Sequence, residues 1–166
     1  MPPKNWIAAS DLFIVQPQTP EEVDALMDDL KLLVSLMPNV DDDYFDGIRE
    51  FPEYLTLIYH QEKPVAFIQI EDSRGYDIGK DSLEFSGSVL PEYRDKGLTQ
   101  TVSPTVIRQA FKRTGKRKML AKIHPENTEA QAAIVALGFE RVQPHPDLPL
   151  PEKVIYKLTR KSALAR

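Results

Sequence analysis

The chain contains no cysteine, and this absence removes several classes of chemistry. Disulfide bonds, zinc sites with cysteine ligands and thiol catalysis are excluded. The lack of cysteine also suits a reducing cytosol, so a cytoplasmic location is expected. Histidine is scarce as well, with three residues scattered along the chain, which gives little support to a metal site. We therefore expect no metal cofactor.

Long apolar runs and an excess of positive charge are also missing. No segment reaches membrane-spanning length, and the N-terminal residues MPPKNWIAAS lack the apolar stretch of a signal peptide. The formal net charge is −4 and the pI is near 5.4. Such a chain is a poor general binder of nucleic acid, which requires a positive field toward phosphate. We expect neither a membrane nor a nucleic acid as partner, whereas a cationic acceptor such as an amine is compatible.

The composition that remains is that of an ordinary globular protein. The chain has 166 residues, of which 42% are hydrophobic and 28% are charged. This length fits one domain with a core of its own. Since no internal repeat or linker is visible, we predict a single domain over residues 1–166, with residues 160–166 as a frayed tail.

Periodicity and turn signals predict an α/β protein with the element order βααβββαβαββ. The predicted strands are 12–15, 54–60, 64–71, 83–90, 117–123, 139–142 and 153–159. The predicted helices are 19–37, 41–51, a segment that ends near 114, and one that follows HPEN (124–127) and ends at 137. Thr19 and Glu22 form a capping-box pattern at the first helix. The whole describes a mixed sheet flanked by helices.

The stretch VLPEYRDKGLTQTVSP, residues 89–104, carries the first functional signal. It leads from a predicted strand through a loop with Arg94, Lys96 and Gly97 into a helix. Unpaired backbone N–H groups at a helix start bind anions, and the two cations would add charge. Neither GxGxxG nor GxxxxGK followed by Ser or Thr is present. A phosphate-binding loop and an exposed turn with solvated charges therefore both remain open.

Two motifs together resemble the GNAT superfamily of N-acetyltransferases. The first is a strand that ends in V-x-P-E, followed by R-x-x-G-x-T at the helix start, in residues 89–99. The second is Asn127 followed by Gly138-Phe139, eleven and twelve residues on, in ENTEAQAAIVALGFERV. The order of elements is also that of the family, so the likeness covers nearly the whole chain. Residues 105–140 faintly resemble the branch that acetylates the N-termini of ribosomal proteins.

The resemblance implies a single-domain fold with a mixed, mostly antiparallel sheet and an acetyl-CoA-dependent N-acetyltransferase activity. Backbone N–H groups of residues 94–99 would cradle the pyrophosphate of acetyl-CoA, and the strand edge at Val89 and Leu90 would bind the pantetheine arm and the thioester oxyanion. Asn127 would lie beside the cofactor or order the next helix. The cofactor-binding residues implied are thus Val89, Leu90, Arg94, Asp95, Lys96, Gly97, Leu98, Thr99 and Asn127.

An amine acceptor arrives as an ammonium ion, so a base must remove a proton. Glu84 is the candidate, because it stands ten residues before Arg94, where one branch of the family carries its catalytic glutamate. The alternative is that Glu84 belongs to a solvated strand face. His124 follows a strand and could contact the acceptor, act as an alternative base, or be a loop residue. The oligomeric state, monomer or homodimer, is left open.

The chain departs from the family pattern at three positions. Thr99 replaces the usual small residue of the loop, and Pro104 lies inside the expected helix, where it predicts a kink or a fresh helix start with Ser103 as N-cap. Ile134 stands where many members have a tyrosine that protonates the thiolate, and its spacing indicates core packing; Tyr156 is a weak substitute. These departures keep open a degenerate acyl-CoA-binding module without catalysis.

Overall fold

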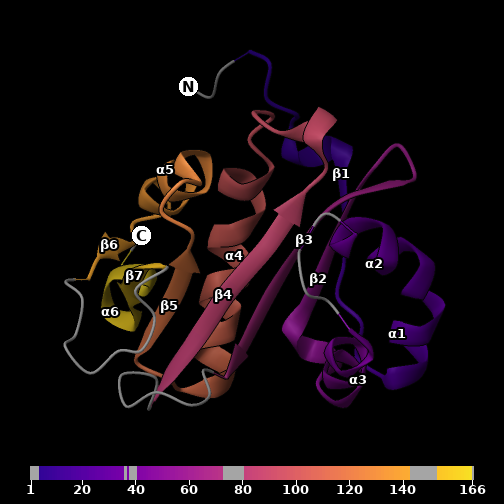
Figure 1. Ribbon diagram of the computed structural model, residues 1–166, viewed down its shortest axis with the longest axis horizontal. Helices are drawn as coiled ribbons and strands as arrows, with labels where there is room; N and C mark the ends of the chain where they lie inside the picture. Colours follow the sequence, from indigo (N-terminus) through magenta and orange to yellow (C-terminus); the bar gives the residue numbers. More distant parts are fainter. Residues whose placement is uncertain (1–3, 36, 38–40, 73–80, 143–152, 166) are drawn as a thin grey trace. The chain divides into compact units, whose positions relative to one another are not determined.

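The computed structural model describes residues 4–35, 37, 41–72, 81–142 and 153–165. Its strands form one seven-stranded sheet in the order β1-β2-β3-β4-β5-β7-β6, with helices before, between and after them (Figure 1). The β1/β2, β2/β3, β5/β7 and β6/β7 pairs are antiparallel and β4/β5 is parallel. The predicted α/β class with a mixed, mostly antiparallel sheet is confirmed.

The chain forms two compact units, which are described one at a time. The first contains residues 1–69 and 87–101, and the second contains residues 70–86 and 102–166. Three elements contribute residues to both units: β3 (Lys63–Asp72), β4 (Ser82–Val89) and α4 (Leu98–Thr114).

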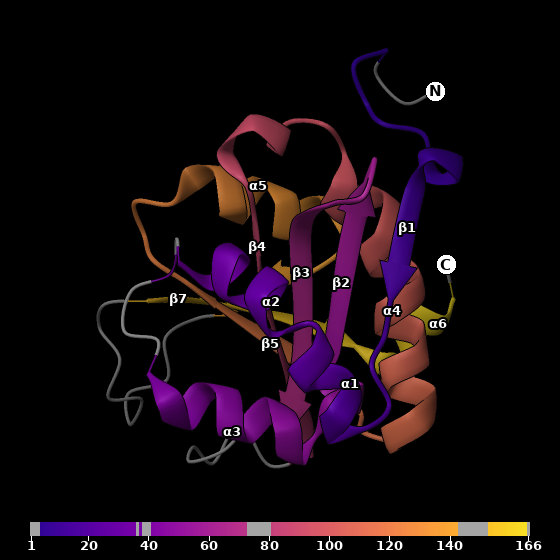
Figure 2. The same cartoon turned by 90° about the vertical axis from the view of Figure 1, so that its right-hand side faces the viewer.

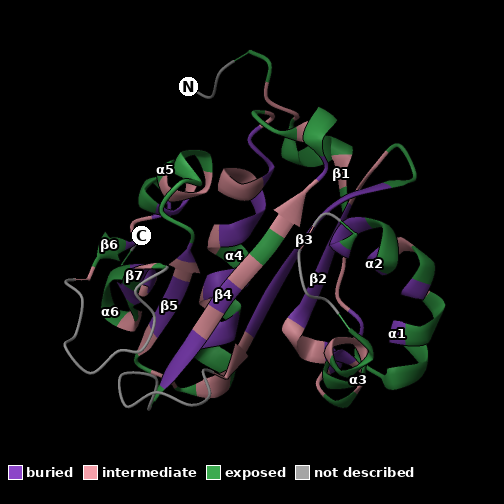
Figure 3. Cartoon of the chain, in the orientation of Figure 1, coloured by how far each residue is buried: buried purple, intermediate pink, exposed green. Residues whose placement is uncertain are grey.

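In the first unit a short antiparallel sheet is covered by three helices. The strands are β1 (Leu12–Val15), β2 (Leu55–His60) and the first part of β3, and the helices are α1 (Pro20–Ala25), α2 (Met27–Val34) and α3 (Asp42–Glu50). The helices lie over one face of β2 and β3 (Figure 2), and most residues of these two strands are buried (Figure 3). The core between them consists of Val23, Met27, Leu30, Leu33, Val34, Ile48, Leu55, Leu57, Phe67 and Leu90.

The first predicted helix is divided. Thr19 caps α1 by accepting a hydrogen bond from the N–H of Glu22 at 3.1 Å, as its sequence pattern predicts, whereas the Glu22 carboxylate accepts from Gln18. At Leu26 the backbone leaves the helical conformation (φ −99°, ψ 5°), and α2 starts at the next residue. The prediction of one helix over 19–37 is wrong at this point, because the apolar spacing continues through the break.

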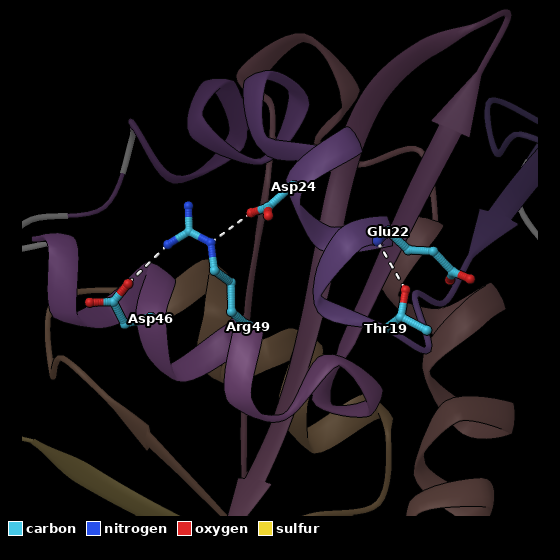
Figure 4. A network of polar contacts seen from close by, with 5 residues as sticks. All are labelled: Thr19, Glu22, Asp24, Asp46 and Arg49. Carbon is cyan, nitrogen blue, oxygen red and sulfur yellow. Dashed lines mark hydrogen bonds and ion pairs between the residues drawn. The ribbon is translucent and has the colours of Figure 1, made fainter.

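An exposed ion network joins α1 to α3 (Figure 4). The Arg49 Nε lies 2.6 Å from Asp24 Oδ1, and its Nη1 lies 2.9 Å from Asp46 Oδ1. The hydrogen bond to Asp24 raises the pKa of Arg49 above its ordinary value. Because the three side chains are solvent-exposed, the network contributes little to stability and mainly orients α3.

The second unit pairs β4 with the C-terminal strands. The elements are the first part of β4, β5 (Lys118–Ile123), β7 (Val154–Thr159) and β6 (Glu140–Arg141), with α5 (Thr128–Ala136), α6 (Arg160–Leu164) and most of α4 (Figure 1). Thr159 caps α6, and Ala163 is buried. Residues 160–164 are therefore a helix, and the predicted frayed tail is wrong for them.

Pro104 is accommodated within one continuous helix, since α4 runs from Leu98 to Thr114 with the proline inside. The predicted fresh start at Ser103 is wrong. Pro104 has no N–H, so the carbonyl of Gln100 loses its usual helical donor. Ser103 is fully buried, and its hydroxyl has no hydrogen-bond partner among the described residues.

Within the described ranges, no helix is long and apolar enough to cross a membrane. Residues 73–80 and 143–152, which connect predicted strands, lie outside the described residues.

Candidate active site

Two side-chain contacts connect the start of the loop between β4 and α4 to the β2–β3 hairpin. After Leu90 the chain forms a short 3-10 turn, η4 (Pro91–Tyr93). The Glu92 carboxylate accepts a hydrogen bond from Lys63 Nζ at 2.9 Å. The Tyr93 hydroxyl lies 3.3 Å from His60 Nδ1, and the two rings pack edge to face. The hairpin itself turns through Gln61 and Glu62, both with positive φ. These contacts fix where the loop begins.

The backbone of the loop presents a row of unpaired donors. Arg94 donates its N–H to the carbonyl of Pro91 at 3.3 Å, so it does not belong to this row, in contrast to the prediction for residues 94–99. No hydrogen bond within the described chain uses the backbone N–H groups of Asp95 to Thr99. Thr101 donates to the carbonyl of Gly97, which closes the first turn of α4. Consecutive N–H groups at a helix start are donors of the kind that can bind a phosphate group.

Two residues of this loop adopt the left-handed conformation, Asp95 at φ 63° and Gly97 at φ 76°. Gly97 is required there for a second reason. A Cβ on it would overlap the indole ring of Trp6, which lies directly against the loop. The side chains of Arg94 and Asp95 are exposed, whereas Gly97 and Leu98 are buried. The conformation of the loop is therefore set by its backbone and by the contact with Trp6, while the side chains of Arg94 and Asp95 extend into solvent.

The strand before the loop offers one backbone donor. The N–H of Leu90 is used, because it donates to the carbonyl of Val65 on β3 at 2.9 Å. Leu90 therefore cannot supply the predicted oxyanion donor. Peptide groups alternate in direction along a strand, so the N–H of Val89 faces away from β3. Val89 is only half-buried, and it keeps the predicted role open.

Glu84 lies on β4 where this strand pairs with β5. The parallel register joins Ser82–Glu84 to Lys118–Leu120. Lys122 Nζ lies 3.5 Å from Glu84 Oε2, and the side chains are 25% (Glu84) and 11% (Lys122) exposed. A carboxylate this far buried and held by one ammonium group is not part of a freely solvated face. The geometry suits a base with a fixed position.

His124 and Asn127 belong to the turn between β5 and α5. Asn127 Oδ1 accepts a hydrogen bond from the N–H of Ala130 at 3.1 Å, so its side chain caps α5. This is the second of its two predicted roles, the ordering of the helix. His124 is exposed, and its Nδ1 accepts from the N–H of Glu126. Gln131 braces the turn by donating to the carbonyls of His124 and Pro125.

Comparison with family models decides the family. The model of the acetyltransferase (GNAT) domain matches residues 8–140. The chain belongs to the GNAT acetyltransferase family. A search of curated protein sequences finds no match to it.

Solved GNAT-like structures share the fold at low sequence identity. The structure of yncA from Salmonella typhimurium with its cofactor acetyl-CoA superimposes with a TM-score of 0.69 at 18% identity, over 90% of this chain and 94% of that chain. An N-acetyltransferase from Staphylococcus aureus Mu50 gives 0.64 at 14% identity, over 90% and 98%. The ribosomal-protein-alanine N-acetyltransferase from Brucella melitensis gives 0.64 at 15%, over 89% and 99%. Identities this low establish the fold.

The structure explains some of the departures from the GNAT pattern. Ile134 is buried, which confirms its predicted packing role. Tyr156 is buried too, and its hydroxyl donates to Gln131 Oε1 at 2.9 Å, so it holds α5 against β7. Thr99 is half-buried in the first turn of α4. No cluster of three or more metal-ligating side chains occurs among the residues that the structure describes.

Sequence reasoning missed Trp6 and Lys122 in this GNAT domain. Trp6 precedes every predicted element, and its contact with Gly97 joins segments about ninety residues apart. Lys122 becomes the partner of Glu84 only through the parallel register of β4 and β5. No local pattern encodes either contact.

Proposed function

We propose that this GNAT protein is an N-acetyltransferase that transfers an acetyl group from acetyl-CoA directly to a primary amine. The observation that carries the proposal is the loop of five unpaired N–H groups, Asp95 to Thr99, at the start of α4 in a chain of this family. A diphosphate is the anion that such a row of donors suits, and acetyl-CoA contains one. The structural neighbour yncA, solved with acetyl-CoA, supports the same ligand.

In this proposal the loop holds the diphosphate, and Arg94 and Lys96 add positive charge at its rim. When bound, acetyl-CoA supplies the activated acyl carbon. The N–H of Val89 stabilises the negative charge that develops on the acyl oxygen, a type of contribution worth about 2.7–4 kcal/mol in enzymes studied by mutation. Glu84 takes one proton of the ammonium group, directly or through water, and Lys122 keeps its carboxylate in position. The neutral amine then attacks the acyl carbon, the C–S bond breaks, and CoA leaves as a thiolate that takes up the second proton of the nitrogen through water.

The acceptor is proposed to be an amine of a protein N-terminus, a side chain or a small molecule. The first of these classes is supported by one neighbour's name, a ribosomal-protein-alanine N-acetyltransferase. The exposed His124, beside the end of β5, is proposed as an acceptor contact. We also propose a cytoplasmic location.

Two measurements on the purified protein test the proposal. Acetyl-CoA and desulfo-CoA should each raise Tm, because a ligand that binds the folded state stabilises it. Thiol release from acetyl-CoA is then followed with peptides bearing free N-terminal alanine or serine, with lysine, with a polyamine and with small amines. Amine-dependent release that Glu84→Gln slows by a factor on the order of 10²–10³ is the expected result. A Tm shift without release from any amine would instead indicate the acyl-CoA-binding module, and no Tm shift would refute both.

A further inference from the structure

We infer that the segment Asn5–Ile7, here called the N-terminal brace, orients the peptide groups of the loop so that its N–H groups face the diphosphate. The brace lies before η1 (Ala9–Asp11) and β1, and all of its contacts with the loop lie inside the first unit. This inference rests on the proposed function, since it concerns the same loop. It assigns a positioning role to Trp6 and Asn5.

Two hydrogen bonds tie the brace to consecutive carbonyl groups. Asn5 Nδ2 donates to the carbonyl of Asp95 at 3.0 Å, and the N–H of Ile7 donates to the carbonyl of Lys96 at 3.0 Å. The indole ring of Trp6, between these two residues, lies against Gly97. Three consecutive residues thus contact three consecutive residues of the loop.

Because the peptide bond is planar, these hydrogen bonds also fix the direction of the N–H groups in the loop. The carbonyl of Asp95 and the N–H of Lys96 belong to one trans peptide group and point in opposite directions. The same holds for the carbonyl of Lys96 and the N–H of Gly97. Because both carbonyls point toward the brace, both N–H groups point away from it. The brace therefore occupies the carbonyl side of the loop and leaves the donor side to an anion.

Trp6 adds a steric constraint to these hydrogen bonds. Gly97 has φ 76°, a conformation that glycine can leave at low cost because it has no Cβ. With a half-buried indole ring packed on its Cα, the peptide groups on both sides of Gly97 have less room to rotate. A loop already fixed in the binding conformation loses less entropy when the ligand arrives, which lowers Kd.

Desulfo-CoA binding to the full chain tests the brace through Trp6→Ala, Trp6→Phe and Asn5→Ala. If the binding-competent loop falls to about a tenth of the population, Kd for Trp6→Ala rises about tenfold. Trp6→Phe should recover part of this loss, and Asn5→Ala should show a smaller rise. The matched control is Phe13→Ala, which removes an aromatic ring that is 68% exposed on β1. Its Kd should equal that of the wild type.

A second readout separates positioning from general damage. S-Acetylpantetheine carries the thioester without the diphosphate, so Trp6→Ala should lower kcat/KM for acetyl-CoA and leave kcat/KM for S-acetylpantetheine unchanged. An equal loss with both substrates would refute the inference, as would an unchanged Kd. A lower Kd would show that the brace covers the site and would refute it too. If Trp6→Ala does not fold, Trp6→Phe and Asn5→Ala decide by the same criteria.

The two proposals fail differently. A wild-type chain that does not bind desulfo-CoA refutes the proposed function and the brace together. A wild-type chain that binds it, with all brace variants binding equally well, refutes the brace alone.

Discussion

The loop at Asp95–Thr99 and the carboxylate at Glu84 are two polar sites that are built in opposite ways. The loop offers backbone N–H groups, and its shape is set by Gly97 and by contacts with the N-terminal brace. Glu84 offers a side chain, held by one partner, Lys122. A single substitution of Glu84 removes its carboxylate. The backbone N–H groups of the loop, in contrast, can be changed only by altering the conformation of the loop.

Because of this difference, we expect affinity for the CoA ligand and the rate of the chemical step to depend on different residues. Backbone donors are retained whatever side chains surround them, which explains how Thr99 can replace a smaller residue without removing a donor. A base depends on one functional group. Variants of the loop should therefore act mainly on Kd for the CoA ligand, and variants of Glu84 should act mainly on kcat.

The largest effect is expected for Glu84→Gln. The amide cannot accept a proton from the amine, so kcat should fall by a factor on the order of 10²–10³. Kd for desulfo-CoA should be unchanged. The control is Glu140→Gln, which neutralises an exposed carboxylate on β6 and should keep full activity. Turnover of Glu84→Gln at the wild-type rate would remove Glu84 from the role of base.

Gly97→Ala tests the loop at Asp95–Thr99. The new Cβ meets the indole of Trp6, and the left-handed backbone is strained for alanine, at a cost of about 1–3 kcal/mol. We expect Kd for desulfo-CoA to rise about tenfold or more, as measured by calorimetry. In a Trp6→Ala background the same substitution should cost less, because the steric part is gone. Equal costs in both backgrounds would contradict the contact.

Asn127→Ala distinguishes a helix cap from a cofactor contact. Loss of the hydrogen bond to the N–H of Ala130 should lower the free energy of unfolding by about 1 kcal/mol, seen as a lower Tm. Kd for desulfo-CoA should stay at the wild-type value. A raised Kd at unchanged Tm would assign Asn127 to the cofactor instead.

The smallest effect is expected for Lys63→Met, which removes one of the two contacts between η4 and the hairpin. The hydrogen bond from Lys63 lowers the pKa of the Glu92 carboxyl, and the hydrogen bond to Glu92 raises the pKa of Lys63. The pair thus adds stability above the ordinary carboxyl pKa of about 4.3, and this stability is lost as the pH falls through the lowered pKa of Glu92. It is also lost in strong alkali, as the pH rises through the raised pKa of Lys63.

Thermal unfolding over a range of pH measures this effect. Because both side chains are exposed, the Tm difference between the wild type and Lys63→Met should be at most about 2 °C near pH 6 and should vanish in acid. Lys112→Met, on an exposed residue of α4, is the control and should match the wild type at every pH. A difference that persists unchanged in acid would show that Glu92 is not the partner responsible.

The order of most elements and the place of the loop could be predicted from the amino-acid sequence alone. The cap at Thr19 acts through a neighbour three residues away, so its signal could be read locally. The motif from Val89 to Thr99 lies at the end of β4 and the start of α4, as predicted, for the same reason. The roles of Glu84, His124 and the loop residues stay predictions until the variants are measured.

The contacts that hold these groups join residues that are distant in the sequence, and they could not be predicted from it. The break at Leu26 divides a helix whose apolar spacing is continuous, and the N–H of Leu90 is occupied by a carbonyl of β3. Lys122 reaches Glu84 across 38 residues of sequence, and Asn5 reaches Asp95 across 90. Such contacts follow from strand register and chain path, which are set by the packing of the whole unit, so no local pattern could have shown them.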